Sequence, residues 1–238
     1  MFKFKDTGFG KIVYSDKIPE LTHFFTTRST DVDNNKKNIL KYLKVDEENL
    51  ISPKQTHSTN IRFADAEIRD YPDTDGLILN NYTQTVFLRF ADCTPIILYD
   101  KKADIGAVVH AGWRGTVGQI AVAAVNKIVS STSSELSDIY AVIGPAIGMC
   151  CYNVGEDVEI GIKNSVQYSD KLIKSVDNKT FVDLKQTNFQ QLIESGIPEA
   201  NIDVCPYCTS CNNDLFYSYR KENGTLNRHN AVIKLNSK

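Results

Sequence analysis

The apolar residues in the middle of the chain form short continuous runs, which predict buried strands. Residues 95–99 (PIILY) and 105–110 (IGAVVH) are too short for helices and flank a polar segment, 100–104, that is typical of a hairpin loop. A hairpin folded about Lys102 pairs Ile97 with Ala107 and places Cys93 opposite His110 or its neighbour. Directly opposed residues have Cβ atoms about 4.5–5.5 Å apart. We therefore expect Cys93 and His110 to be neighbours.

After this predicted hairpin the pattern changes to helical spacing, with apolar residues recurring from 117 to 128. Thr116 followed by Gln119 matches a capping box, which predicts a helix that starts just after the glycines. The free backbone N–H groups of a helix start favour an anion, and a guanidinium suits phosphate or carboxylate. A glycine-rich turn with an ordinary surface arginine is an equally good interpretation. The candidate phosphate-binding residues are Gly112, Arg114 and Gly115.

The remaining patterns predict a protein that mixes strands and helices. Further strands are expected at residues 2–5, 12–14, 60–63, 77–79, 86–90, 139–143, 202–204, 215–220 and 231–235. Helical turns or helices are expected at 38–43, 46–50, 156–162 and 184–193, and residues 29–37 are expected to form a loop. No internal repeat or long linker divides the chain, so residues 1–238 are expected to form a single α/β (α+β) domain.

Composition and charge narrow the class of protein. With 42% hydrophobic residues, the 238-residue chain can bury a substantial core. Because 27 basic and 29 acidic side chains nearly balance, nucleic acid is not expected as a partner. No apolar run approaches the roughly 18–20 residues of a membrane span, and the N-terminus lacks the apolar core of a signal peptide. We expect a cytoplasmic protein with small-molecule partners.

A histidine in the segment KQTHS, His57, is the candidate third member of a metal site with Cys93 and His110. A lone histidine is usually structural, but two neighbouring ligands need one more nitrogen to form a three-ligand site. A thiolate with two imidazoles suits zinc, and copper is able to substitute. The sequence therefore predicts one Zn²⁺ site, with Cu²⁺ as the alternative ion.

The other five cysteines are less informative. The adjacent Cys150 and Cys151 are interpreted as small buried residues, because neighbouring cysteines do not easily bind one metal together. Cys205, Cys208 and Cys211 give a C-x₂-C-x₂-C run that is similar to the opening of an iron–sulfur motif but lacks the fourth cysteine. No iron–sulfur cluster is expected.

Taken together, the motifs resemble the laccase-domain family, whose members have been described as polyphenol oxidases, peptidoglycan-editing factors and purine nucleoside phosphorylases. The resemblance covers nearly the whole chain and is carried by KQTHS (54–58), TDGLI (74–78), ADCTP (91–95), HAGWRGT (110–116), IGPAIG (143–148), CTSC (208–211) and FYSYR (216–220). It implies a sandwich of two mixed sheets flanked by helices, and a metal site on His57, Cys93 and His110. Substrate binding is expected at Gln55, Arg28 and Arg228.

Three functions compete. A laccase needs many more histidines than the four in this chain, although one bound copper could still give oxidase activity. A Cys93–His110 dyad suits a cysteine hydrolase, because an imidazole activates a thiol. The third is purine nucleoside phosphorolysis of adenosine, inosine or S-methyl-5′-thioadenosine, with Arg114 binding phosphate and Asp92 as candidate proton donor. Metal-dependent adenosine deamination is a side activity, although the zinc deaminase motif is absent.

Overall fold

Two six-stranded sheets form the centre of the protein in the computed structural model, which describes residues 1–65 and 67–236. The first sheet is largely antiparallel; in spatial order it contains β1 (Phe2–Thr7), β2 (Gly10–Ser15), β3 (Leu21–Thr26), β15 (His229–Leu235), β7 (Thr85–Phe90) and β4 (Leu50–Ile51). The second contains β14 (Ile202–Val204), β10 (Ile139–Ile143), β8 (Thr94–Asp100), β9 (Ile105–Ala111), β6 (Gly76–Leu79) and β5 (Ile61–Phe63). Parallel pairs occur at the edges, where β4 joins β7, β14 joins β10 and β5 joins β6.

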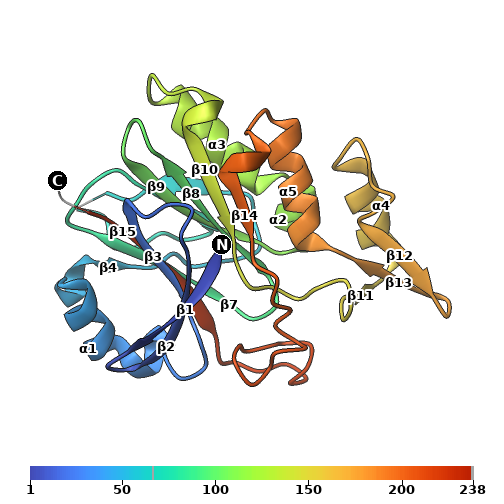
Figure 1. The fold of residues 1–238 in the computed structure, drawn as a ribbon, viewed down its shortest axis with the longest axis horizontal. Coiled ribbons are helices and arrows are strands. Elements are labelled where there is room, and N and C mark those ends of the chain that lie inside the picture. Colours follow the sequence, from blue (N-terminus) through green and yellow to red (C-terminus); the bar gives the residue numbers. More distant parts are fainter. Residues whose placement is uncertain (66, 237–238) are drawn as a thin grey trace.

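Among the described residues, five helices and a small third sheet lie around this centre (Figure 1). The helices are α1 (Val32–Leu43), α2 (Trp113–Val117), α3 (Ile120–Ser130), α4 (Glu156–Asn164) and α5 (Leu184–Glu194). Single 3₁₀ turns lie at Glu47–Asn49, Leu136–Asp138 and Glu199–Asn201. The small sheet contains β11 (Asn153–Val154), β13 (Lys179–Val182) and β12 (Ile173–Val176), and it lies with α4 at the right of Figure 1.

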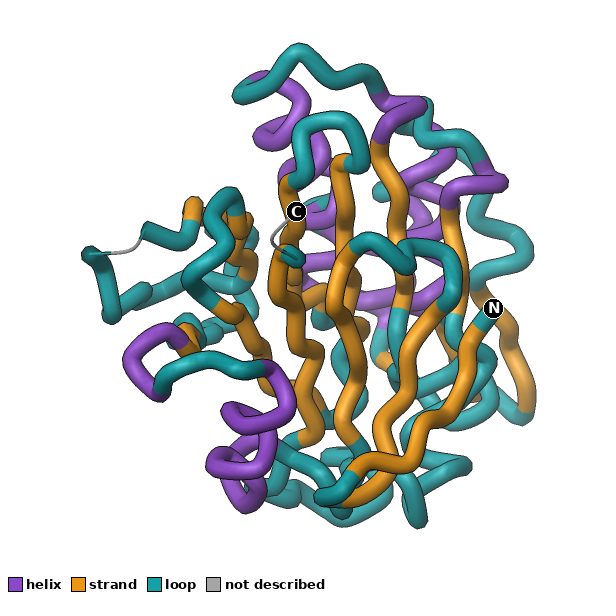
Figure 2. Tube along the Cα trace, turned by 60° about the vertical axis from the view of Figure 1, so that its left-hand side comes forward, coloured by secondary structure: helices purple, strands orange, loops and turns teal. Residues whose placement is uncertain are grey.

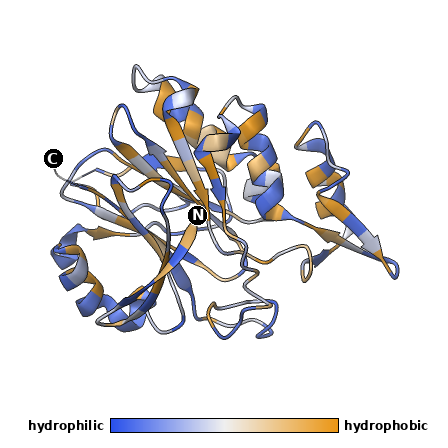
Figure 3. Cartoon of the chain, in the orientation of Figure 1, coloured by the Kyte–Doolittle hydropathy of each residue, from blue (hydrophilic) through white to orange (hydrophobic). Residues whose placement is uncertain are grey.

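The two large sheets pack face to face, as expected from the resemblance. Phe25 and Leu88 of the first sheet share one buried cluster with Ile97 and Val108 of the second. The outer face of the second sheet packs against α3 and α5, and the outer face of the first packs against α1. Figure 2 shows the long strands side by side with helices outside them, and Figure 3 shows apolar residues concentrated in the strands and on the covered faces of the helices. The layer order is therefore α/β/β/α, and no described helix is long and apolar enough to cross a membrane.

The predicted central hairpin is confirmed, but its register is shifted by one residue. Ile97 lies opposite Val108 rather than Ala107, and His110 lies opposite Pro95. The loop between β8 and β9 has an even number of residues, 101–104, because the Asp100 carboxylate accepts hydrogen bonds from the N–H groups of residues 102 and 103 and tightens the turn. The symmetry axis therefore falls between two residues instead of on Lys102.

The helix predicted after the glycines is also different. Helix α2 begins at Trp113 with Gly112 as its N-cap, and the chain breaks at Gln119, whose φ is 54°, before α3 begins. Thr116 lies inside α2, where its N–H donates to the Gly112 carbonyl, so the Thr116–Gln119 capping box is wrong. A residue with a larger side chain than Gly118 would clash with Thr59 at 2.5 Å, and this close approach places the break.

Two further expectations are wrong. Residues 29–37 are not all loop, because α1 begins at Val32 behind Asp31, whose side chain accepts a hydrogen bond from the Asn34 N–H. Residues 215–220 do not form a strand. Carboxylates bind backbone groups there instead: Glu222 accepts from the Ser218 N–H, and Asp92 accepts from the N–H of Arg220.

Candidate metal centre between two cavities

The three predicted metal ligands meet at one end of the second sheet. His57 lies in the loop between β4 and β5, Cys93 immediately precedes β8, and His110 belongs to β9. Their ligand atoms all lie within 4.8 Å of one another, and His57 Nε2 lies 3.8 Å from Cys93 Sγ. The expected proximity of Cys93 and His110 is confirmed, although the two residues are diagonal neighbours rather than opposed ones because of the register shift.

The buried carboxylate of Asp75 holds this centre together. Its Oδ1 accepts a hydrogen bond from His110 Nδ1 at 2.7 Å and another from the His57 backbone N–H at 3.0 Å. Its Oδ2 accepts from the N–H groups of Thr56 and Ser58 and from the Ser58 hydroxyl. Burial raises the pKa of Asp75, but these hydrogen bonds outweigh it and hold that pKa well below its usual range.

This arrangement leaves the other ring nitrogen of His110 available to a metal. A carboxylate that accepts from one imidazole nitrogen fixes the tautomer and orientation of a metal-binding histidine. Sequence reasoning missed this function of Asp75, which lies in a Thr-Asp-Gly run that has the composition of a turn. The signal that could have found it is an aspartate immediately before a strand that pairs with the strand of His110.

The backbone around the ligands fits a metal ion. A Cβ atom on Gly112 would lie 3.0 Å from His57 Cδ2 and 3.1 Å from Cys93 Sγ, so the glycine leaves room for both side chains. His57 and Asp92 have φ angles of 64° and 84°, which non-glycine residues rarely adopt. Such strained positions cluster at functional sites. A thiolate and two imidazoles with an open fourth position suit a catalytic zinc.

Electrostatics favour the charged forms of Cys93 and His110. Burial opposes charge on both groups, but the positive charge of His110 and hydrogen bonds from both histidines lower the pKa of Cys93. In the same way, the negative charge of Cys93 and the hydrogen bond to Asp75 raise the pKa of His110 against the effect of burial. Cys93 is thus set up as a thiolate, which is the form that binds metals or acts as a nucleophile.

The centre lies between two cavities. The larger has a volume of about 780 Å³, and the smaller one about 250 Å³. Both are lined by His57, Asp92, Cys93 and Tyr152, so two of the three candidate metal ligands form part of the wall of each, whereas His110 lines only the larger cavity. The larger cavity is also lined by Gln55, Tyr219, Arg220 and Arg228, and the smaller one by Trp113 and Arg114. A ligand in either cavity can approach the same centre.

Asp92 and Gln55 line the larger cavity, but their polar groups have protein partners. Asp92 Oδ1 accepts from the Thr209 hydroxyl at 2.6 Å and Oδ2 from the Arg220 N–H at 2.7 Å. The Gln55 amide exchanges two hydrogen bonds with the backbone of Arg89. Both side chains therefore fix the cavity wall in addition to facing it.

The candidate phosphate- and substrate-binding residues do not all line the same cavity. Arg114 is exposed, lies 4.3 Å from the Trp113 ring centroid and lines the smaller cavity. Gly115 is buried, and a Cβ there would lie 3.1 Å from the His110 carbonyl oxygen, so it supports close packing behind the site. Arg228 lines the larger cavity and donates to two carbonyls of its own loop.

Arg28 is not among the residues that line either cavity. Its guanidinium forms an ion pair with Glu222 at 2.8 Å and lies 4.4 Å from the Tyr217 ring centroid. Sequence reasoning missed Tyr152 and Arg220, which both line the larger cavity. The Arg220 guanidinium carbon lies 5.3 Å from the centroid of the Tyr152 ring. Arg220 lies in the FYSYR motif and Tyr152 directly follows the Cys150–Cys151 pair, but neither position marked the residue as part of the site.

Comparisons with known proteins agree with this fold. The chain is 34% identical to "Purine nucleoside phosphorylase YlmD" of Geobacillus stearothermophilus, over 86% of this chain and 78% of that protein. It is also 34% identical to "Adenosine deaminase RL5" from an unknown prokaryotic organism, over 75% and 72% of the two chains. The crystal structure of Bacillus licheniformis hypothetical protein YfiH superposes with a TM-score of 0.91 at 30% identity, covering 98% of this chain and 99% of the other. The model of the family described as "Multi-copper polyphenol oxidoreductase laccase" matches residues 19–236, and the chain belongs to that family.

Proposed function

We propose that the protein is a purine nucleoside phosphorylase that converts adenosine, inosine and S-methyl-5′-thioadenosine with phosphate into the base and the corresponding ribose 1-phosphate. The observation that carries this proposal is that the candidate metal centre of His57, Cys93 and His110 adjoins two cavities, both of which are lined by His57 and Cys93. Two adjoining volumes beside one centre allow two substrates to be bound next to each other. The names of two relatives, a purine nucleoside phosphorylase and an adenosine deaminase, support purine nucleosides as the substrate class.

The resident ion is proposed to be zinc, bound by His57, Cys93 and His110. When bound, this ion supplies a Lewis acid and lowers the pKa of a coordinated water to about 7, which suits a side activity of adenosine deamination. The protein's own contribution is orientation, because Asp75 fixes the His110 ring and Gly112 admits both neighbouring ligands.

The larger cavity is proposed to bind the nucleoside. Tyr152 and Tyr219 give it aromatic walls that suit a purine, and Arg228 supplies a cation beside them. Asp92 lines this cavity and is proposed to donate a proton to the leaving purine. The volume of about 780 Å³ lies within the range of about 300–1,000 Å³ that small-molecule sites occupy.

The smaller cavity is proposed to bind phosphate through Arg114. Its guanidinium is held over Trp113 at the end of a buried strand, and a planar fork of N–H donors suits the anion. Helix α2 has only five residues, so the guanidinium, rather than the helix, has to provide most of the attraction. A nucleophile held there and a nucleoside in the larger cavity would meet beside Cys93.

The laccase alternative is disfavoured by the positions of the histidines. His23 is buried in the first sheet, where its ring contacts the Leu21 carbonyl and the Ser15 N–H. His229 is buried against Phe90 and Phe216. Neither belongs to the metal-binding groups found among the described residues, so the two remaining histidines supply one mononuclear site. The Cys93–His110 pair keeps a cysteine hydrolase as the second candidate.

Product analysis separates these functions. Purified protein is incubated with adenosine, inosine or S-methyl-5′-thioadenosine, with and without phosphate, and the products are resolved by chromatography. We expect base and ribose 1-phosphate to form only with phosphate, at a rate that saturates, and deamination to be independent of phosphate. Equal base release without phosphate, with free ribose as product, would show that the enzyme is a hydrolase. Oxidation of phenols with no turnover of nucleosides would favour the oxidase.

A further inference from the structure

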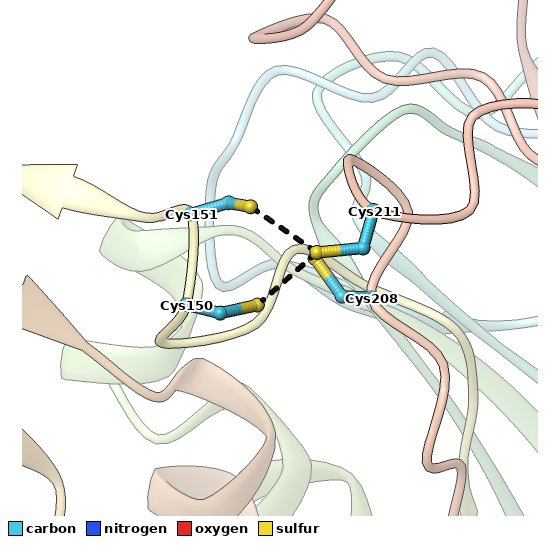
Figure 4. Close-up of side chains that lie close together, drawn as sticks. All are labelled: Cys150, Cys151, Cys208 and Cys211. Atoms are coloured by element: carbon cyan, nitrogen blue, oxygen red, sulfur yellow. Dashed lines mark hydrogen bonds between the residues drawn. The ribbon is translucent and has the colours of Figure 1, made fainter.

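Four of the six cysteines gather in a second cluster that the proposed function does not use. The Sγ atoms of Cys150, Cys151, Cys208 and Cys211 all lie within 4.8 Å of one another. Figure 4 shows the side chains of two turns pointing toward one another, one turn carrying Cys150 and Cys151 and the other Cys208 and Cys211. The expectation that Cys150 and Cys151 are small buried residues is wrong, since Cys150 is exposed and Cys151 half-buried. Their adjacency does not keep their sulfurs from a common neighbour, because both Sγ atoms lie 3.5 Å from Cys211 Sγ. Cys205, the first cysteine of the C-x₂-C-x₂-C run, is buried and does not belong to the cluster.

The spacing of the sulfurs matches one tetrahedral ion. Cys211 Sγ lies 3.5 Å from both Cys150 Sγ and Cys151 Sγ. A zinc ion with Zn–S bonds of about 2.3 Å sets its four sulfurs about 3.8 Å apart, so small side-chain rotations complete the site. A disulfide has its sulfurs about 2.0 Å apart. The sulfurs of an iron–sulfur cluster are spread more widely, because several irons and sulfides separate the cysteines.

The backbone around the cluster resembles the support of a metal site. The Gly148 N–H donates to Cys208 Sγ at 3.2 Å, and such a donor stabilises a thiolate ligand. A Cβ at Gly148 would lie 3.3 Å from both Cys150 Sγ and Cys208 Cβ, so the glycine lets the two turns approach. An isolated backbone β-bridge between Ala146 and Cys208 holds the two turns side by side. The exposed Cys150 and Cys211 leave an entry path for an ion.

We propose that Cys150, Cys151, Cys208 and Cys211 form a second, structural metal site that holds one zinc ion in tetrahedral tetrathiolate coordination. Four thiolates around one ion close the coordination shell, so this site has no open position for a substrate. Binding releases the thiol protons to solvent and needs no oxidant. The site is separate from the His57, Cys93 and His110 centre and does not depend on the nucleoside chemistry.

The cluster lies next to two segments that form the wall of the larger cavity, so an ion bound there would affect that wall. One turn leads directly to Tyr152, and the other carries Thr209, whose hydroxyl donates to Asp92. A zinc that joins the two turns would therefore hold two segments of the cavity wall, which come from distant parts of the sequence, in a fixed relation. We expect its loss to loosen the wall rather than to remove a reacting group.

The test isolates the second site by removing the first. The double variant His57→Ala/Cys93→Ala is purified under reducing conditions with zinc, dialysed, and analysed for metal by mass spectrometry. We expect one equivalent of zinc to remain per chain. Adding Cys211→Ser should remove that equivalent, whereas adding Cys205→Ser, a cysteine of the same run outside the cluster, should retain it.

A spectroscopic arm keeps the proposal testable if the cysteine variants fold poorly. The double variant loaded with cobalt should show thiolate-to-cobalt charge transfer and the intense d–d bands of tetrahedral coordination. Three outcomes would overturn the proposal: substoichiometric zinc with four reactive thiols in the folded double variant, a mass deficit of two hydrogens that reveals a disulfide, or stoichiometric iron and sulfide. Retention of full zinc by a folded Cys211→Ser variant would also overturn it.

Discussion

The Asp75 carboxylate accepts a hydrogen bond from His110 Nδ1 at 2.7 Å, and both side chains are almost fully buried. The same carboxylate accepts backbone N–H groups of the loop that carries His57, so one residue orients two proposed ligands. The carboxylate thus couples the loop before β5 to strand β9. Metal binding should depend on this residue although its carboxylate is not one of the ligands.

We predict that Asp75→Asn weakens zinc binding at the His57, Cys93 and His110 centre by about 10–100-fold, the usual effect of losing an outer hydrogen-bond partner. An amide cannot accept from all of its present donors, so stability should also fall. Zinc affinity is measured by competition with a chelator, using protein shown to be folded by circular dichroism. Asp73→Asn is the matched control, because Asp73 is an exposed neighbour that bonds Thr56 and Asn60 and should leave the zinc affinity unchanged. Equal affinities in the two variants would contradict the orienting role of Asp75.

Gly112→Ala should disturb the same centre by steric pressure alone. The φ of Gly112 is −67°, which alanine adopts freely, so the effect comes from the new Cβ against His57 and Cys93. We expect zinc affinity to fall by about tenfold or more, in the range found when ligand support is lost. Gly8→Ala is the control, because no atom lies within 4 Å of a Cβ at that position. Unchanged zinc affinity in Gly112→Ala would mean that the two ligands are not held against this backbone.

Arg114→Ala should selectively impair the use of phosphate. Losing one preorganised charge-stabilising donor costs about 10²–10³ in rate, and Arg114→Lys should recover only part because an ammonium lacks the bidentate fork. The measurement is the dependence of inosine cleavage on phosphate concentration, together with zinc content, which should not change. Arg28→Ala is the control: its guanidinium pairs with Glu222 rather than lining a cavity, so phosphate dependence should stay close to that of the unaltered protein. A large loss of phosphate-dependent cleavage in Arg28→Ala, with no loss in Arg114→Ala, would show that phosphate binds at Arg28 and not at Arg114.

The buried His229 should make the protein less stable in acid. Burial lowers its pKa from 6.5 to about 3, so the folded protein stays neutral at this ring where the unfolded chain takes up a proton. The stabilising contribution is therefore complete above pH 6.5 and is lost as the pH falls toward 3, with a slope of up to about 1.4 kcal/mol per pH unit. Urea unfolding at several pH values measures the slope, and His229→Gln should flatten it. An identical slope in that variant would show that other groups control the acid sensitivity.

Local sequence patterns were sufficient for most of the secondary structure. The apolar runs at β8, β9 and β10 predicted strands because β8 and β9 are fully buried and β10 is buried except at Tyr140, between the facing sheet and the helices. The loop between β8 and β9 predicted the hairpin, and with it the meeting of Cys93 and His110. The register still missed by one residue, since it depends on how the Asp100 side chain closes the turn.

Long-range contacts decided what local patterns could not. Residues 215–220 are predicted as a strand, yet the carboxylate of Asp92, which is 128 positions away, accepts a hydrogen bond from the Arg220 N–H, and no strand forms there. Helix α2 ends early because Gly118 packs closely against Thr59 of a distant loop. A sequence window that covers one of these elements contains neither Asp92 nor Thr59. The tertiary contacts therefore override the local propensity, and the window gives no sign of them.

By itself, the sequence determined the short buried strands, the helical segments that cover them, and the cysteine and histidines that can bind a metal, because each follows from the residue types and spacing within one segment. Only the tertiary structure decided that Asp75 orients His110, that Arg28 pairs with Glu222, and that Cys150 and Cys151 meet Cys208 and Cys211. These partners lie 35, 194 and about 60 positions apart in the chain. Their proximity depends on the packing of two sheets and the turns between them, which no local pattern of hydrophobic and polar residues encodes.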